Sequence, residues 1–168
     1  KDYATAREML KRSAELFHAR QDRYGEATAL NAIGGILFEE GEYQTAADRF
    51  GEAIVLYEEI GADSSAATSY ANRGEAFLKL HRLEESGVCF EKALSRFESV
   101  RGGLGSLTDA KSDYLNKRAH VYRQYANLLT LVGRPDESFD VIQKVKARGL
   151  LDLLASGGLV AASGLTPA

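Results

Sequence analysis

The chain has 168 residues, of which 45% are hydrophobic and 27% charged, so it can bury a core and is not a disordered segment. Its 21 basic and 24 acidic residues leave a net charge of −3, which argues against general affinity for nucleic acids. The single cysteine, Cys89, excludes an internal disulfide, and no apolar run reaches the roughly 18 residues that span a bilayer. We therefore expect a cytoplasmic protein that binds neither membranes nor nucleic acid.

The sequence repeats with a period of forty residues. The repeated positions are Gly34 and Gly74, Phe50 and Phe90, and Ala53 and Ala93. A further unit follows at a spacing of fifty-two, with Ala126 in the place of Gly74. A period of this size is typical of arrays of stacked helical units. The predicted division is a half repeat at 1–23, repeats at about 24–61, 62–101 and 108–156, and an insertion near 102–107.

Each unit predicts a pair of helices. Within 26–40, and again within 43–60, apolar residues recur at steps of three and four, as one buried helical face requires. Gly41 and Gly61 are expected to end these helices, because glycine adopts the left-handed conformation without a Cβ clash. The next helix is expected to be capped by Ser64 or Ser65.

The last pair of helices is expected at about 108–132 and 135–156, joined at Gly133 and Pro135. With a single helix over 2–21, the chain is predicted to contain about seven helices in antiparallel pairs. Residues 157–168 contain three glycines and a proline and are expected to form a linker or a disordered tail. Since the chain also begins at Lys1 rather than at a methionine, we expect it to be a fragment of a longer protein.

Two glycines inside predicted helices, Gly34 and Gly74, each cost up to about 1 kcal/mol relative to alanine. Close contact between helices would offset this cost. We expect Phe50 and Tyr57 to fill the space beside Gly74 and Ala71.

This pattern of small and aromatic residues resembles the tetratricopeptide repeat (TPR). One copy reads Leu30, Ile33, Gly34, Leu37, Gly41, Tyr43, Ala46, Phe50 and Ala53. The resemblance covers about residues 1–156 and implies an all-α fold, a right-handed α-α superhelix. The period of forty exceeds the usual 34, and the proline that often ends a unit is absent, so we expect longer helices, as in the forty-residue variants of the family.

The segment Ala147–Leu154 is similar to the junction in bacterial proteins that join such repeats to a caspase-like CHAT peptidase domain. In that interpretation the catalytic His and Cys would lie beyond Ala168, so no catalytic residue falls in this chain. The alternative is an amphipathic last helix, since the open end of a helical stack needs a cap. The capping residues would then be Leu150, Leu151, Leu153 and Leu154.

The chain holds little chemistry of its own. His18, His81 and His120 lie on separate helices or turns without metal-binding spacing. Cys89 is flanked by apolar residues and is interpreted as a packed thiol. Gly102–Gly105 is not a phosphate loop, because no Gly-Lys-Ser/Thr sequence follows it. We therefore expect no enzymatic activity, no metal and no cofactor.

The resemblance implies that the first helix of each pair lines a concave groove that binds a protein or peptide ligand. Candidate groove residues are those on first helices that avoid the packed stripe. They are Thr28, Asn31, Gly35, Phe38, Thr68, Asn72, Glu75, Lys79, Lys117, His120, Arg123, Gln124 and Asn127. Asparagine and glutamine can bond a peptide backbone as donor or acceptor, and Arg123 could pair with a carboxylate. The set of Lys, Asn and Arg with which some family members bind chaperone tails is not reproduced.

Two further patterns concern partners. The fourth unit is locally basic, which predicts an acidic segment bound at that end; the residues are Lys111, Lys117, Arg118, Arg123 and Arg134. The helix over 2–21 has no preceding partner, so one side of it is expected to be exposed, with Met9, Leu10, Leu16 and Phe17. That edge is expected to dock on flanking domains of the same chain or on a second copy.

The leading hypothesis is a protein-binding scaffold, in particular the regulatory region of a TPR–CHAT peptidase. The alternatives are the sensor or oligomerisation region of a bacterial signalling ATPase or transcription regulator, and a stand-alone adaptor. A His and Cys in the following sequence would favour the peptidase, and a phosphate loop in the preceding sequence would favour the ATPase.

Overall fold

The computed structural model describes residues 3–100 and 108–155, with side chains described for 3–99 and 117–146. The described part contains seven helices and no strand. The helices are α1 (Tyr3–Ala19), α2 (Arg23–Glu39), α3 (Tyr43–Glu59), α4 (Asp63–Lys79), α5 (Leu83–Val100), α6 (Thr108–Leu131) and α7 (Pro135–Ala155). The expected insertion near 102–107 and the expected tail at 157–168 lie outside the described residues.

The first four helices each have 17 residues, and each begins twenty residues after the one before. The residue in left-handed conformation at each turn ends the helix. Gly41, Gly61 and Gly133 take this place with φ of 83°, 68° and 77°, as predicted, whereas Gln21 and His81 adopt it without being glycine, at 57°. In each turn the next residue's N–H reaches back five residues to a helix carbonyl, as from Glu42 to Leu37 at 2.9 Å, and so satisfies an otherwise free acceptor.

The predicted capping of α4 by Ser64 or Ser65 is wrong. The helix begins at Asp63, and the capping position is Ala62, which has no side chain able to accept a hydrogen bond. The regular spacing of the turns places the helix start two or three residues earlier than a serine cap would. Asp63 in the first turn contributes a favourable charge at the positive end of the helix instead.

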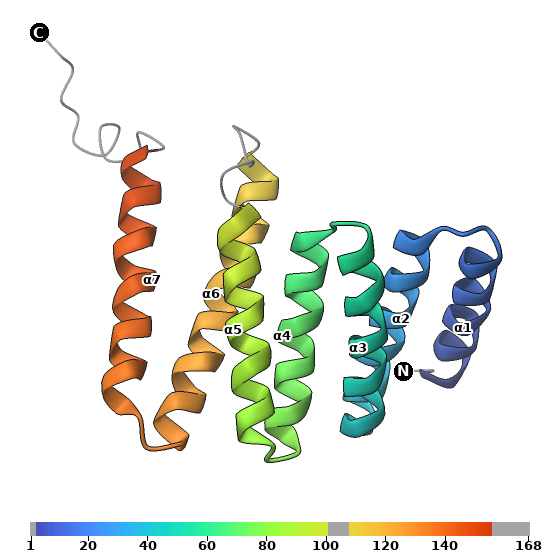
Figure 1. Ribbon diagram of the computed structural model, residues 1–168, viewed down its shortest axis with the longest axis horizontal. Coiled ribbons are helices and arrows are strands. Elements are labelled where there is room, and N and C mark those ends of the chain that lie inside the picture. The colour runs from blue at the N-terminus through green and yellow to red at the C-terminus, as the bar shows by residue number, and fades with distance from the viewer. Residues whose placement is uncertain (1–2, 101–107, 156–168) are drawn as a thin grey trace, which may run out of the picture.

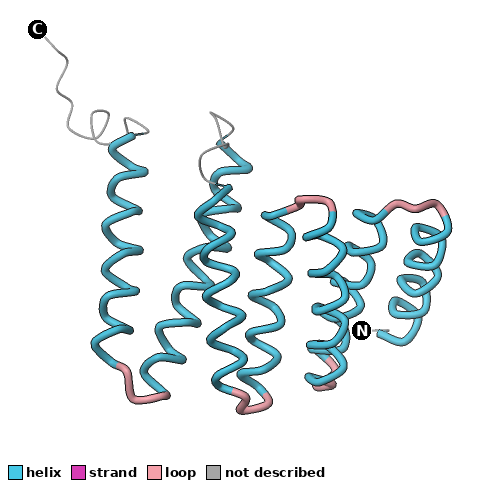
Figure 2. Tube along the Cα trace, in the orientation of Figure 1, coloured by secondary structure: helices cyan, strands magenta, loops and turns pink. Residues whose placement is uncertain are grey.

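Consecutive helices run antiparallel, and the turns alternate between the two ends of the stack (Figures 1 and 2). Helix α2 lies behind α3, and α6 lies behind α5 (Figure 1). Each helix packs on its neighbours in sequence, and α4 also contacts both α2 and α6. The first helices of the pairs therefore form one layer. This arrangement confirms the prediction of an all-α superhelical repeat fold.

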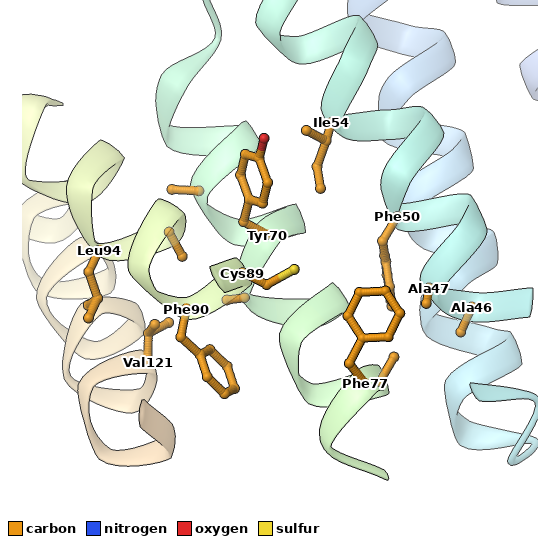
Figure 3. Close-up of a cluster of buried hydrophobic side chains, with 14 of the residues drawn as sticks. Ala46, Ala47, Phe50, Ile54, Tyr70, Phe77, Cys89, Phe90, Leu94 and Val121 are labelled. Carbon is orange, nitrogen blue, oxygen red and sulfur yellow. The ribbon is translucent and has the colours of Figure 1, made fainter. Parts of the chain in front are cut away.

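Aromatic rings fill the spaces that the two helix-interior glycines leave, but not in the predicted pairing. A Cβ added at Gly34 would lie 2.7 Å from Phe50 Cε1, and one at Gly74 would lie 2.9 Å from Phe90 Cε1. Each ring thus packs on the glycine of its own helix pair, and the expectation that Phe50 fills the space beside Gly74 is wrong. Both rings are buried in one continuous core (Figure 3).

The two ends of the stack expose apolar side chains. On α1, Met9 is 69% exposed and Leu16 57% exposed, whereas Leu10 packs against the core. Phe17 is half-buried, since its ring lies where a Cβ at Gly25 would be. At the other end, exposed apolar residues include Leu131 and Phe139. The four leucines expected to cap this end belong to α7, and their side chains lie outside those described.

Candidate functional site

The layer of α2, α4 and α6 presents a strip of polar side chains, which we call the α2–α4–α6 face. Asn31 on α2 and Asn72 on α4 meet across this layer, with Asn72 Nδ2 donating to Asn31 Oδ1 at 3.4 Å. Ser69, which is fully buried, donates to the same oxygen at 3.0 Å. The Asn31 carbonyl is therefore fixed by two donors from α4, and among the described residues no acceptor is found for the Asn31 amide nitrogen.

The strip continues from α4 to α6. His120 Nε2 lies 2.6 Å from Glu75 Oε1, and Arg123 Nη2 lies 3.3 Å from His120 Nδ1. Because a guanidinium can only donate, Nδ1 accepts from Arg123 and the Nε2 proton is donated to Glu75. These contacts join three candidate residues into a row, so that polar groups run from α2 through α4 to α6.

A cavity of about 220 Å³ lies in this face between α2 and α4. It is lined by Gly35, Phe38, Glu39, Phe50, Asn72 and Glu75. Four of these residues belong to the candidates predicted from sequence, and they come from two successive first helices. Gly35 keeps the cavity open, since a Cβ added there would meet no atom within 4 Å. The ring of Phe38 is held by an edge contact with Tyr43, with 5.2 Å between centroids.

Other candidate residues lie elsewhere. Thr28 is turned toward α3, where its hydroxyl lies 3.0 Å from the hydroxyl of Tyr57. Thr68 donates to the carbonyl of Ser64 on its own helix at 3.1 Å. The structure therefore does not bring these two threonines to the cavity. Lys79, Lys117 and Gln124 lie on α4 and α6, with the two lysines exposed and Gln124 half-buried.

Asn127 and Arg123 line a different cavity, of about 340 Å³, between α6 and α7. Its walls are mainly apolar and include Tyr122, Ile142 and Val145. Ile142 stands fifty-two residues after Phe90, so a smaller side chain replaces the ring that fills the preceding pair. Arg123 thus borders both the polar strip and this apolar cavity.

Sequence reasoning missed two residues of the site. Ser69 was not considered, although it is the buried donor that orients Asn31. Glu39 was not among the candidates either, yet it lines the cavity. The signal that could have identified it is spacing, because Glu39 follows Gly35 by four residues and therefore shares its helix face.

A larger cavity, of about 500 Å³, lies between α1 and α3, and residues of α2 form its floor. Its floor is apolar and includes Ile33, which occupies the place that Arg73 takes forty residues later. The guanidinium of Arg73 packs against Gly51 and so fills the corresponding space in the next pair. At its rim, Arg7 of α1 pairs with Glu40 at 2.8 Å.

The basic surface expected on the fourth unit is smaller than predicted. Arg118 is buried, with 5% of its surface exposed. Arg134, in the turn before α7, pairs with Glu137 in the first turn of α7 at 2.5 Å. The side chain of Lys111 lies outside those described. Of the four basic residues whose side chains are described, Lys117 and Arg123 are the exposed ones on α6, so the basis for an acidic partner at this end is reduced.

The described side chains show no arrangement for covalent catalysis. Burial raises the pKa of the Cys89 thiol, which keeps it protonated and weakly nucleophilic. His18 pairs with Glu26 at 2.9 Å on the exposed surface, and His120 pairs with Glu75. Within the described ranges no three His, Cys, Asp or Glu residues are grouped so that they could hold a metal ion. None of the helices in those ranges combines the length and the apolar character that a membrane crossing requires.

Comparison with known proteins supports the fold. No protein-family model and no curated protein matches the sequence. The structure is similar to the crystal structure of BtubC (BKLC) from P. vanneervenii, with a TM-score of 0.69 and 15% sequence identity. The alignment covers 99% of this chain and 60% of BtubC, so the chain spans 60% of that protein's length. At this identity the likeness shows a shared helical-repeat fold and nothing of function.

Proposed function

We propose that this chain is a protein-interaction scaffold that binds a segment of another polypeptide on the α2–α4–α6 face. The observation that carries the proposal is the row of polar groups joining three successive first helices, with a cavity beside it. Asn31, Asn72 and Arg123 supply donors and acceptors that match those of a peptide backbone. All three lie on helices, so the backbone that carries them is already ordered before binding.

The proposal is tested with peptides selected from a random library displayed on phage. Asn72→Arg places a long charged side chain on the α2–α4–α6 face, and the matched control Val55→Arg places the same side chain on α3, where Val55 is 54% exposed. We expect Asn72→Arg to weaken binding of the selected peptides at least about tenfold, measured by fluorescence anisotropy, while Val55→Arg binds as the unaltered chain does. Loss of binding only in Val55→Arg would place the partner on α3 and contradict the proposal.

We further propose that the array is of the TPR type, in its forty-residue form, and that it regulates a CHAT peptidase joined to it. The support is the repeat pattern together with the likeness of Ala147–Leu154 to the CHAT junction, a segment that belongs to the last helix, α7. The assignment is tested by the mass and peptide map of the native protein. A His and Cys in the adjoining sequence would support it. A phosphate loop would favour a signalling ATPase or regulator, and a protein of about this chain's mass would favour a cytoplasmic adaptor.

The proposal gives this chain no catalytic role. A peptidase assay on the purified chain is expected to show no turnover. Activity that survives repurification and is lost in Cys89→Ala would overturn the assignment.

A further inference from the structure

The cavity between α2 and α4 combines two acidic side chains with aromatic walls. Glu39 and Glu75 reach it from the two helices, and Phe38 and Phe50 contribute their rings. Asn72 adds a side-chain amide on the α4 side. Carboxylates and aromatic faces both attract cations, and an aromatic wall also accepts an aliphatic stem. A site lined by this set favours a long side chain with a positive end.

Neither carboxylate is paired with a lysine or an arginine among the ion pairs found in the described residues. Glu39 is exposed, and within the part of the chain that the structure describes it makes no ion pair. Glu75 accepts a hydrogen bond from Nε2 of His120, and the other ring nitrogen of His120 accepts one from Arg123. The hydrogen bond from His120 holds the Glu75 carboxylate in place beside the cavity. Lys79, one turn further along α4, forms no ion pair with either carboxylate among those found in the described residues.

The size of the cavity suits one side chain. Its volume of about 220 Å³ is below the roughly 300–1,000 Å³ of pockets that hold drug-sized ligands. The open position is Gly35, where the helix backbone itself borders the cavity without an intervening Cβ. The polar strip continues on either side of the cavity, with Asn31 on α2 and His120 on α6. A polypeptide lying along the strip would therefore place one of its side chains over the cavity.

We infer that this cavity receives an arginine or lysine side chain of the bound polypeptide, with the stem against Phe38 and the charge between Glu39 and Glu75. The inference rests on the proposed function, since it names the partner's chemistry for the same face. It also selects against partners with an acidic residue at that place, because a third negative charge would be repelled.

The test uses four pools of short peptides that are degenerate except at the central position, which holds arginine, lysine, norleucine or glutamate. Each pool is titrated into isotopically labelled chain, and amide shifts are followed by NMR at Gly35 and Asn72. We expect the arginine and lysine pools to shift these signals at concentrations at least about tenfold lower than the norleucine pool needs. The glutamate pool should be the weakest.

Two variants act on the cavity by different means. Gly35→Leu fills it, and the space beside Gly35 allows the new side chain to be accommodated without disturbing the core. Glu39→Gln/Glu75→Gln removes the two charges. The matched control is Glu8→Gln/Glu84→Gln, which removes the same charge from exposed positions on α1 and α5. Circular dichroism and thermal unfolding show that each variant is folded.

The inference holds if both cavity variants abolish the preference for arginine and lysine while the control retains it. Peptides that bind the α2–α4–α6 face without preferring a cation, or whose preference survives in both cavity variants, would overturn the inference and leave the proposed function intact. If no pool shifts any signal of α2, α4 or α6, while the peptides selected on phage bind elsewhere on the chain, both fail.

Discussion

Two neighbouring glycines on α2 allow the packing of the repeat to be tested within a single turn of helix. A Cβ at Gly35 would meet nothing within 4 Å, whereas a Cβ at Gly34 would lie 2.7 and 2.8 Å from two ring atoms of Phe50. The optimal separation of carbon atoms is about 3.5–4.0 Å. Phe50 is only 2% exposed, so its ring cannot move into solvent to make room. Alanine at these two positions should therefore have opposite effects on stability.

The expected magnitudes follow from these contacts. Gly35→Ala should raise the free energy of unfolding by up to about 1 kcal/mol, because alanine favours the helix by about that amount. Gly34→Ala gains the same helix preference but loses about 1–3 kcal/mol to overpacking against Phe50. The two variants should differ by about 2 kcal/mol, which corresponds to about 4–8 °C in Tm for a chain of this size.

Urea unfolding followed by far-UV circular dichroism measures this difference directly. The expected order of midpoints is Gly35→Ala, then the unaltered chain, then Gly34→Ala. Gly74→Ala provides a second test, since a Cβ there would lie 2.9 Å from Phe90 and should destabilise as Gly34→Ala does. If Gly34→Ala stabilises the chain as much as Gly35→Ala, the packing of an aromatic ring on the glycine of its own pair is refuted.

Three further changes have defined outcomes in the same unfolding assay. His81→Gly should stabilise the folded chain by about 0.5–1 kcal/mol. The φ of 57° costs an L residue about 1–2 kcal/mol, whereas the greater freedom of glycine in the unfolded chain offsets only about 0.5–1 kcal/mol of the relief. An unchanged midpoint would count against this turn geometry. Ser86→Ala should destabilise by about 1 kcal/mol, because the buried Oγ donates to the Gly74 carbonyl at 2.8 Å, and a neutral result would contradict that bond. Burial, then the hydrogen bond to Glu58, raises the pKa of Tyr70 to about 12 from an ordinary 10.0. A pKa raised in the folded state gives stability that is present below pH 10 and lost as the pH rises toward 12. The difference in free energy of unfolding between the unaltered chain and Tyr70→Phe should therefore shrink across that range. A difference that stays constant would refute the assignment.

The helices and their turns could be predicted because both signals are local. Apolar spacing marks each buried face, and glycine marks the left-handed residue at Gly41, Gly61 and Gly133. Gln21 and His81 adopt the same conformation in turns of the same regular spacing, and the conformational preference of these two residue types does not predict it. The start of α4 at Asp63 follows from the same regularity, which overrode the capping preference of the serines.

The site was harder to predict because it depends on neighbours across helices. The face that carries Asn31, Asn72 and His120 could be proposed from helical position together with the resemblance to the TPR. Their mutual contacts depend on the register between α2, α4 and α6, and a single sequence does not specify this register. The same limit explains the wrong partner for Phe50, since Gly34, sixteen residues before it, and Gly74, twenty-four residues after it, are both candidates for its ring. Glu39 was missed because an exposed glutamate carries no signal until the cavity beside it is seen.

The central claim is that a polypeptide binds the α2–α4–α6 face. The most direct measurement uses a peptide selected on this chain and carrying a photoreactive benzophenone, with the crosslinked residues identified by mass spectrometry. We expect adducts on α2, α4 and α6 around Gly35 and Asn72, and their loss when unlabelled peptide is added in excess. Adducts confined to α1, α3 or α5, with equal sensitivity to the competitor, would contradict it.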